Sequence, residues 1–338
     1  FCSPRELPWS LKSPAPSTHA IEVLFDNQVA GLLEGERATA TLNVVWRELD
    51  GLMRHADLPI EVVVRSSFDI VYRENALWSS QTVYAADRVT IAEGAEVSLD
   101  VDQAVSELSV VDGTLAMSQT QTLTVNDDFA ISGSGVLQLT DGVLSTDDNS
   151  LTVDGLIHIN GGSLTAEMEG RSRNIAGNGL VEISAGDMSF VNGVPSNVLQ
   201  LNTNMRISGG TVSLSGQIYI GFTRHTLFEV IGDESTISMV RLNMSGQINK
   251  GTIVFRLDES GVSKINVPGW MNLGSAQLIV DGSNYTGGSA SIVLIDSNNL
   301  VSPIPEANIS LIGFAQGLNA SIEQDSTNGK DWVRLIIE

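Results

Sequence analysis

The chain has 338 residues and a net charge of −22 at pH 7, although only 17% of its residues are charged. Acidic side chains outnumber basic ones 40 to 18, which argues against nucleic acid as a partner, because binding to phosphates depends on lysine and arginine. No apolar run reaches the roughly 18 residues that a membrane span needs, so the sequence predicts no transmembrane segment.

Residues 1–20 form a proline-rich tail that should be extended and flexible on its own. We expect this tail to dock on a neighbouring subunit, with Trp9 as its anchor. The single cysteine, Cys2, has no internal partner for a disulfide. A free exposed thiol is the favoured interpretation of Cys2, and a disulfide between chains or an attached lipid are the alternatives.

Residues 21–84 predict a small N-terminal domain of mixed α and β structure. Segments 21–26, 59–65 and 68–73 look like strands, because β-branched and aromatic residues recur in them. Between them, six apolar residues fall on one helical stripe: Leu42, Val45, Trp46, Leu49, Leu52 and Met53. A strand over the first part of that stretch is the alternative. The domain would cap the rest of the chain or contact a partner.

Residues 85–250 contain a repeat with a period of about 24–28 residues. One apolar reference residue recurs in each repeat: Val110, Ile131, Ile159, Ile183, Ile207 and Ile237. Columns two residues before and five and seven residues after this reference are also apolar, so that 22 of 24 positions match. The pattern breaks at Gln138, where one extra corner residue would turn Leu137 and Leu139 inward instead.

Two further columns mark the corners of the repeat. Five residues before the reference lie Asn126, Asp154, Asn178 and Asn202, and two residues after it lie Gly133, Gly161, Ala185 and Gly209. Alternating strands between regular corners are typical of a β-solenoid, in which each coil buries its inward residues against its neighbours. We predict a parallel, right-handed β-helix, with a β-sandwich or a propeller as the alternative.

Residues 251–338 hold more strand-like segments, but these lose the regular spacing. They predict irregular final coils and a β cap, because the end of a solenoid otherwise exposes unpaired strand edges.

The stretch DRVTIAEGAEVSLDVDQAVSELSVVDGTLAM (87–117) resembles the opening coils of secreted bacterial parallel β-helix repeat proteins. The stretch FRLDESGVSKINVPGWMNLGSAQLIVDGSNYTGG (255–288) is similar to the C-terminal module of autotransporter-passenger-type and surface-anchored solenoid proteins. The resemblance covers about residues 85–338 and rests on spacing and on the pattern of small residues. It implies secretion and a surface, adhesive or assembly role, and it transfers no functional residue.

A polysaccharide lyase would need a basic side chain as proton acceptor and cations beside the substrate carboxylate. The best basic cluster combines Arg171 and Arg173 in one corner loop with Arg224 and His225 in the corresponding loop about two coils later. Solvated loop residues that pair with acidic neighbours are the alternative. Pairs of acidic residues are so common here that none of them singles out a hydrolase site.

Sugar-binding sites also use aromatic rings as platforms. The repeat region 85–250 contains no tryptophan, which ranks catalysis below a structural role. Tyr219, Phe222 and Phe228 are the rings that could be exposed, and Tyr219 joins the basic cluster as a candidate ligand-binding residue.

Four asparagines have the glycosylation pattern Asn-x-Ser/Thr: Asn243, Asn284, Asn308 and Asn319. Unmodified asparagine is the alternative for each. We expect no cofactor and no dedicated metal site, and Ca²⁺ at residues 145–150 or at Asp127 and Asp128 would be adventitious.

These features together predict an extracellular structural or adhesive β-solenoid that assembles head to tail into a filament or surface layer. The alternative is a polysaccharide-binding or polysaccharide-degrading domain, for which extracellular glycans are the expected partners. A third interpretation is a passenger segment that extends other domains from a cell surface.

Overall fold

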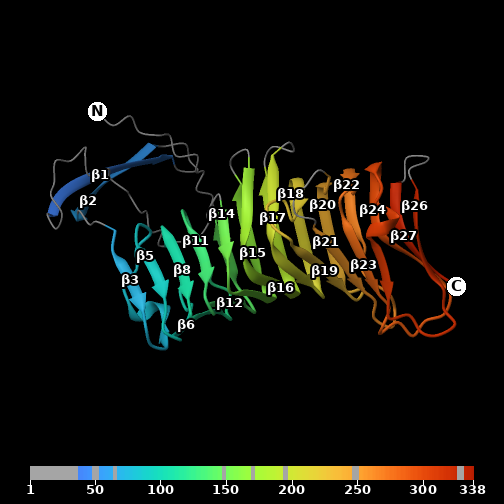
Figure 1. Cartoon of the computed structure of the whole chain (residues 1–338). Coiled ribbons are helices and arrows are strands. Elements are labelled where there is room, and N and C mark those ends of the chain that lie inside the picture. Colours follow the sequence, from blue (N-terminus) through green and yellow to red (C-terminus); the bar gives the residue numbers. More distant parts are fainter. Residues whose placement is uncertain are drawn as a thin grey trace. The chain divides into compact units, whose positions relative to one another are not determined.

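The structure is a computed structural model that describes residues 37–47, 53–63, 67–146, 150–168, 172–192, 197–245, 251–325 and 331–338. It divides into two compact units, Phe1–Ser67 and Phe68–Glu338 (Figure 1). No helix among the described residues is long and apolar enough to cross a membrane. Cys2 and Trp9 lie outside the described residues, so their role in assembly stays a prediction.

The described part of the N-terminal unit is a two-stranded antiparallel sheet of β1 (Arg37–Arg47) and β2 (Met53–Val63). The predicted helical stripe is therefore wrong at Leu42, Val45, Trp46 and Met53, which lie in these strands, while Leu49 and Leu52 lie outside the described residues. Threonine and valine recur through β1, and β-branched side chains favour a strand over a helix. This preference outweighs the helical spacing of the apolar residues.

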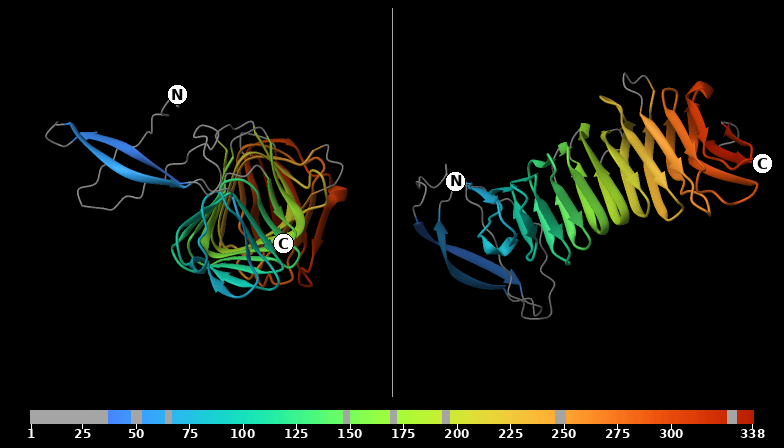
Figure 2. Two further views of the ribbon diagram at one scale, coloured as in Figure 1. Left: turned by 90° about the vertical axis from the view of Figure 1, so that its left-hand side faces the viewer. Right: turned by 60° about the horizontal axis from the view of Figure 1, so that its bottom comes forward.

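The second unit is a β-solenoid whose strands stack in parallel on three faces, which we call A, B and C (Figures 1 and 2). The complete coils visit the faces in the order A, B, C. Strands of successive coils therefore lie side by side although they are far apart in the sequence. The predicted parallel β-solenoid is confirmed.

Face A begins with β3 (Asp69–Tyr72), β5 (Arg88–Ile91), β8 (Glu107–Val111), β11 (Phe129–Ser132) and β14 (Ser150–Val153). It continues with the N-terminal parts of β16 (Ser172–Asn192) and β17 (Val198–Ile207). It ends with the C-terminal parts of β18 (Gly210–Ile220), β20 (Ser235–Asn243), β22 (Ile265–Asn272) and β24 (Ala290–Ser302).

Face B begins with β4 (Ala76–Leu77), β6 (Glu96–Ser98), β9 (Thr114–Met117), β12 (Val136–Leu139) and the N-terminal part of β15 (Leu156–Met168). It continues through the middle of β16 and the end of β17 to β19 (Leu227–Ile231), β21 (Thr252–Arg256), β23 (Gln277–Asp281) and β25 (Ile309–Ile312). Face C contains β7 (Gln103–Val105), β10 (Thr122–Val125), β13 (Val143–Thr146) and the parts of β15, β16, β18, β20, β22 and β24 that the other faces do not use.

The first coil starts at Asp69, not at the predicted boundary of residue 85, because β3 already pairs in parallel with β5. The length of the coil also changes along the chain. On face A, Ile70 has Val89 as its neighbour in the next coil, whereas Met271 near the other end has Leu300. A late coil therefore contains many more residues than the first one, and the predicted period describes only the middle coils.

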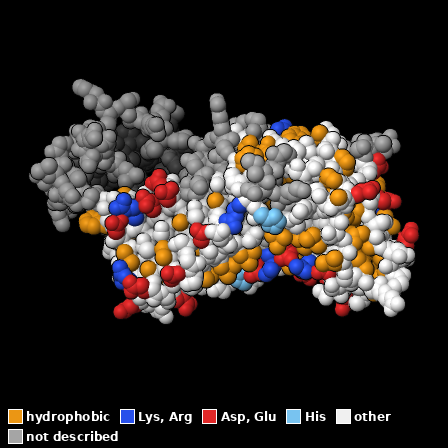
Figure 3. Space-filling view, viewed as in Figure 1, with side chains coloured by type: hydrophobic (Ala, Val, Ile, Leu, Met, Phe, Trp, Pro, Cys, Tyr) orange, Lys and Arg blue, Asp and Glu red, His pale blue; other side chains and the backbone are white. Residues whose placement is uncertain are grey.

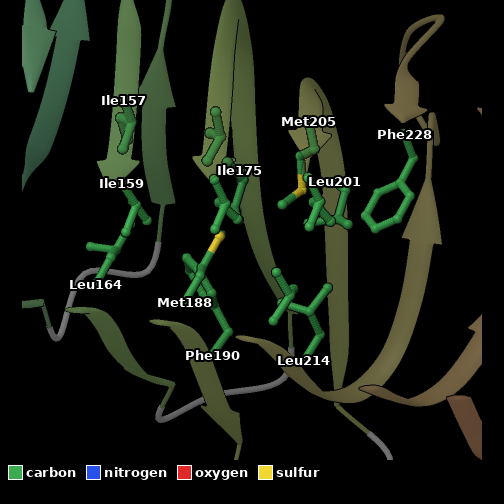
Figure 4. Packing of buried hydrophobic residues seen from close by; sticks show 14 of the residues in the cluster. Ile157, Ile159, Leu164, Ile175, Met188, Phe190, Leu201, Met205, Leu214 and Phe228 are labelled. Atoms are coloured by element: carbon green, nitrogen blue, oxygen red, sulfur yellow. The ribbon is translucent and has the colours of Figure 1, made fainter. Parts of the chain in front are cut away.

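Alternate residues of each strand point inward and form one continuous core that reaches from Ile70 to Ile337. The inward orientation predicted for Leu137 and Leu139 is confirmed, since both are 0% exposed. Figure 4 shows how side chains from all three faces meet inside the middle coils, among them Ile157, Leu164, Ile175, Met188, Leu201 and Phe228. Burying one such side chain stabilises the fold by about 1.5–3 kcal/mol.

The predicted column through Ile159 is right in its middle and wrong at both ends. Ile159, Ile183 and Ile207 are neighbours on face B. Ile131 instead lies on face A, and Ile237 lies on face C. All three faces carry the same alternation of apolar and polar residues, so an alignment by hydrophobicity does not tell one face from another.

Glycines stack at the corner between faces B and C. The pair Gly161–Gly162 turns the chain inside β15, as predicted, and Gly186 and Gly210 follow in the next two coils. Gly186 has a φ of 78°, a backbone conformation that glycine adopts without strain. A Cβ atom on Gly186 would lie 2.3 Å from the carbonyl oxygen of Gly162, so the coils approach too closely for any side chain.

Antiparallel strands close the C-terminal end of face C. After η2 (Glu306–Asn308) and β25, strand β27 (Asp331–Ile337) pairs antiparallel with β24, and β26 (Ala320–Asp325) pairs antiparallel with β27. The predicted β cap is therefore confirmed. Gln324 fastens this cap, because its side chain forms two hydrogen bonds with the backbone of Ile304, at 2.8 and 2.9 Å.

Aromatic side chains fill the N-terminal end of the solenoid interior. Trp78, in the short helix η1 (Trp78–Ser80), is fully buried, and its carbonyl oxygen accepts a hydrogen bond from the Tyr72 hydroxyl at 2.6 Å. Burial, with a smaller contribution from Asp100, raises the pKa of Tyr72 to about 12. The hydroxyl is therefore a permanent donor in this contact.

Candidate functional site

Tyr219 lies on the outer surface of face A. Its neighbours Ile218 and Ile220 point into the core, so the alternation of β18 directs Tyr219 and Gln217 outward. Phe222 follows in the corner after β18 and is 40% exposed. The two rings meet edge to face, with their centroids 5.2 Å apart and their planes at 72°. Phe228, the third ring predicted to be available, is fully buried instead.

Side-chain amides surround the Tyr219 hydroxyl. Gln217 donates to it from Nε2 at 2.7 Å, and Asn243, one coil further on, donates from Nδ2 at 3.1 Å. Gln200 lies opposite Tyr219 in the preceding coil. These contacts fix the ring at the centre of a polar surface that spans several coils.

The buried Asn202 holds one edge of this surface. It donates to Asn174 Oδ1 at 2.8 Å and to Gln200 Oε1 at 3.4 Å, and its own oxygen accepts from the backbone of Thr223. Asn202 thus departs from the predicted polar column. Asn178 and Asp154 lie next to each other as that column predicts, and the backbone nitrogen of Asn178 donates a hydrogen bond to Asp154 Oδ1 at 2.7 Å. We call the outward set the amide–aromatic patch: Asn174, Gln200, Gln217, Tyr219, Phe222 and Asn243.

The predicted basic cluster of Arg171, Arg173, Arg224 and His225 stays a prediction, because Arg171 and the side chain of Arg173 lie outside what the structure describes. Arg224 and His225 lie at the corner between faces A and B, where Arg224 donates to the carbonyl oxygen of Gly177, two coils earlier. Arg173 lies in β16, paired with Leu199 on face A, rather than in a corner loop. Arg171 lies outside the described residues.

His225 is likewise held by a structural contact. Its Nε2 lies 3.1 Å from the hydroxyl of Thr252, which in turn donates to Gln277 at 3.1 Å. Arg224 and His225 therefore connect different coils of the solenoid.

A ladder of alternating charges runs along the outer surface of face B. It contains one residue from each of five successive strands: Glu182, Arg206, Glu229, Arg256 and Asp281. Arg206 contacts Glu182 at 3.5 Å and Glu229 at 2.7 Å. Arg256 contacts Glu229 on its other side and Asp281 at 2.6 Å. Figure 3 shows acidic and basic side chains gathered on the visible side of the solenoid.

Glu229 is the centre of this ladder and is only 1% exposed. Burial alone would raise its pKa, but hydrogen bonds from Arg206 and Arg256 outweigh burial and hold the pKa below its ordinary value. Hydrogen bonds from Ser283, together with contacts with Arg256, outweigh the opposing effect of burial and hold the pKa of Asp281 below its ordinary value. The ladder was not predicted from the sequence. Acidic and basic residues do alternate there at intervals of about one coil, and this pattern could have indicated it.

Face C presents neutral hydroxyl groups. One outward column contains Thr124, Ser145, Thr165, Ser189, Ser213 and Ser238 in successive coils. The three faces therefore differ in chemistry: amides and rings on the middle of face A, ion pairs on face B and hydroxyls on face C.

The four predicted glycosylation sites differ in accessibility. Asn284 and Asn319 are exposed. The side-chain nitrogens of Asn243 and Asn308 instead donate hydrogen bonds, to Tyr219 and to the backbone of Ala276. Glycosylation at Asn284 or Asn319 stays a prediction that the geometry allows.

Adventitious binding of Ca²⁺ at residues 145–150 or at Asp127 and Asp128 stays a prediction. Asp127 and Asp128 are exposed, and no group of three His, Cys, Asp or Glu side chains converges among the described residues. Part of the segment 145–150 lies outside those residues.

No family model matches the chain, and no curated protein or solved structure matches it either. The resemblance to secreted bacterial β-helix proteins stays a prediction. The functional argument therefore depends on the geometry of the solenoid itself.

Proposed function

We propose that this protein is an extracellular structural solenoid whose copies associate end to end and present an adhesive surface on their sides. The observation that supports this most is the distribution of exposed apolar residues. Nine large hydrophobic side chains are exposed among the described residues, and seven of them lie in the first two coils or the last one. These seven are Phe68, Val71, Leu77, Tyr84, Val101, Val301 and Ile312.

The terminal strands support the same proposal. Among the described residues, β3 and β4 pair only with the coil that follows them, and β25 pairs only with β23. An edge strand carries unpaired backbone donors and acceptors that another chain can complete. One end of a copy would then meet the opposite end of the next, which is a contact that extends without closing into a ring.

The interior of the solenoid suits a structural role. Its core is continuous through all coils, and the ladder on face B connects five successive strands outside that core. The coils that carry the ladder are thus fixed to one another on both their inner and their outer surfaces. The extracellular location is part of the proposal and follows from the resemblance; antibody labelling of intact cells of the source organism tests it.

Replacement of Leu77 by glutamate tests the end-to-end contact. Leu77 is 54% exposed in the first coil, and Val191, which is 52% exposed in the middle of the solenoid, is the matched control. In sedimentation velocity experiments over a range of concentrations, we expect wild-type protein and Val191→Glu to associate and Leu77→Glu to stay monomeric. A wild-type protein that is monomeric at every concentration, or a Leu77→Glu variant that associates normally, would contradict the proposal.

A further inference from the structure

We infer that the amide–aromatic patch binds a neutral polysaccharide chain that lies along face A, across the strands. This inference depends on the proposed function, because it names the partner of the adhesive side of the solenoid. It is carried by different observations, namely the exposed ring of Phe222 and the hydrogen-bonding groups around Tyr219.

Aromatic rings and amides are a suitable combination for sugars. The apolar face of a sugar ring packs on an aromatic side chain, and Phe222 is the most exposed aromatic residue in the middle of the solenoid. A side-chain amide both donates and accepts hydrogen bonds, as a sugar hydroxyl does. The patch offers both features on one surface.

Several of these amide atoms have no partner of their own in the described part of the chain. Gln217 uses its Nε2 on Tyr219 but its Oε1 accepts no hydrogen bond there. Gln200 and Asn174 each accept a hydrogen bond from Asn202, while their amide nitrogens donate none there. The side chains are already positioned by the contacts they do make, so a ligand would meet one free acceptor and two free donors.

The length of the patch favours a polymer over a single sugar. Its residues come from four successive strands on face A, in β16, β17, β18 and β20. Strands lie about 4.8 Å apart, so the patch extends for about 15 Å along the solenoid. A chain of several linked sugars would cover it.

The charges of the site favour a neutral chain. The six side chains of the patch are uncharged, and the protein carries a net charge of −22, which disfavours acidic polymers. The neighbouring Arg224 is bonded to the carbonyl oxygen of Gly177, and Arg241, opposite Gln217 in the next coil, has a partner of its own.

Affinity electrophoresis in gels that contain a soluble polysaccharide tests this inference. The neutral probes are a β-glucan, a xylan and a mannan, and the acidic probes are polygalacturonate and alginate. We expect at least one neutral probe to retard the protein and the acidic probes to leave it unretarded. Phe222→Ala should weaken the binding at least tenfold, whereas Val191→Ala, also at an exposed apolar position, should leave it unchanged.

Three results would overturn the inference: retardation by none of the neutral probes, equal binding by Phe222→Ala and wild type, or a preference for the acidic probes. Circular dichroism of each variant shows whether the fold is intact, and Gln217→Ala provides a second variant with a different chemistry. The monomeric Leu77→Glu protein separates the two proposals. If it binds the probe, the site stands even if end-to-end association fails; if wild type associates but binds no probe, only the site is refuted.

Discussion

Individual glycines set how closely the coils of this solenoid stack. Gly179 lies next to Gly155 of the preceding coil, at the corner between faces A and B. A Cβ atom on Gly179 would lie 2.0 Å from the carbonyl oxygen of Gly155. The three nearest atoms all belong to the backbone of the preceding coil, so no flexible side chain can move aside. A single methyl group at this position must therefore displace one coil against another.

We expect Gly179→Ala to lower the free energy of unfolding by about 2–3 kcal/mol, the cost of an overpacked contact. Chemical denaturation with urea measures this. Gly288→Ala is the control, because a Cβ atom on Gly288 would meet nothing within 4 Å. Equal stability of the two variants would show that the coils do not stack as closely as described.

The inward residues of single strands could be predicted from the sequence, because the alternation of apolar and polar residues determines which side chains are buried. The corner at Gly161 and the inward pair Leu137 and Leu139 follow from that rule. The partners of Tyr219 could not be predicted in the same way. Gln217 is local, but Gln200 and Asn243 reach Tyr219 only through the register of neighbouring coils.

At the level of strands, the ladder on face B fixes five successive coils to one another. Glu229 accepts hydrogen bonds from the arginines on both sides, and all three side chains belong to different coils. Removing its charge would leave two arginines facing each other without their shared partner. The effect depends on pH, because only ionised Glu229 attracts both.

We expect Glu229→Gln to lower the free energy of unfolding at pH 7 by about 2 kcal/mol, less than for a fully buried ion pair because Arg206 and Arg256 are 42% and 45% exposed. The folded-state pKa lies below the ordinary value of 4.5. The contribution of Glu229 is therefore complete above pH 4.5 and is lost as the pH falls through the folded-state value. Thermal unfolding between pH 7 and pH 2.5 measures it.

The difference between wild type and Glu229→Gln should shrink as the pH falls below 4.5, because protonation of Glu229 removes the charge that attracts both arginines. Glu182→Gln, at the exposed end of the ladder with a single contact at 3.5 Å, should cost less than about 1 kcal/mol. A difference for Glu229→Gln that stays constant with pH would mean that packing, and not charge, is what the ladder contributes.

The arrangement of strands was harder to predict than the strands themselves. Coil length differs along face A, as the pair Ile70 and Val89 and the pair Met271 and Leu300 show, so no fixed period aligns the whole chain. Ile131, on face A, was therefore aligned with Ile159, which lies on face B. The first coil was assigned to the N-terminal domain for the same reason, since its short strand β3 lies closer to β5 in the sequence than the predicted period allows.

For the solenoid as a whole, stability should be close to a sum of contacts between neighbouring coils, because the strands of each described coil pair with those of the coil before it and the coil after it. The C-terminal strands β26 and β27 end the stacking on face C, while β25 leaves face B with an open edge. Association through that edge and through the apolar residues of the first coil would preserve the three faces from one copy to the next.

Electron microscopy of the purified full-length protein tests end-to-end association most directly. We expect lines of particles joined at their ends, which lengthen as the concentration rises and are absent from Leu77→Glu preparations at the same concentrations. Isolated particles at every concentration, or copies joined side by side, would contradict the account.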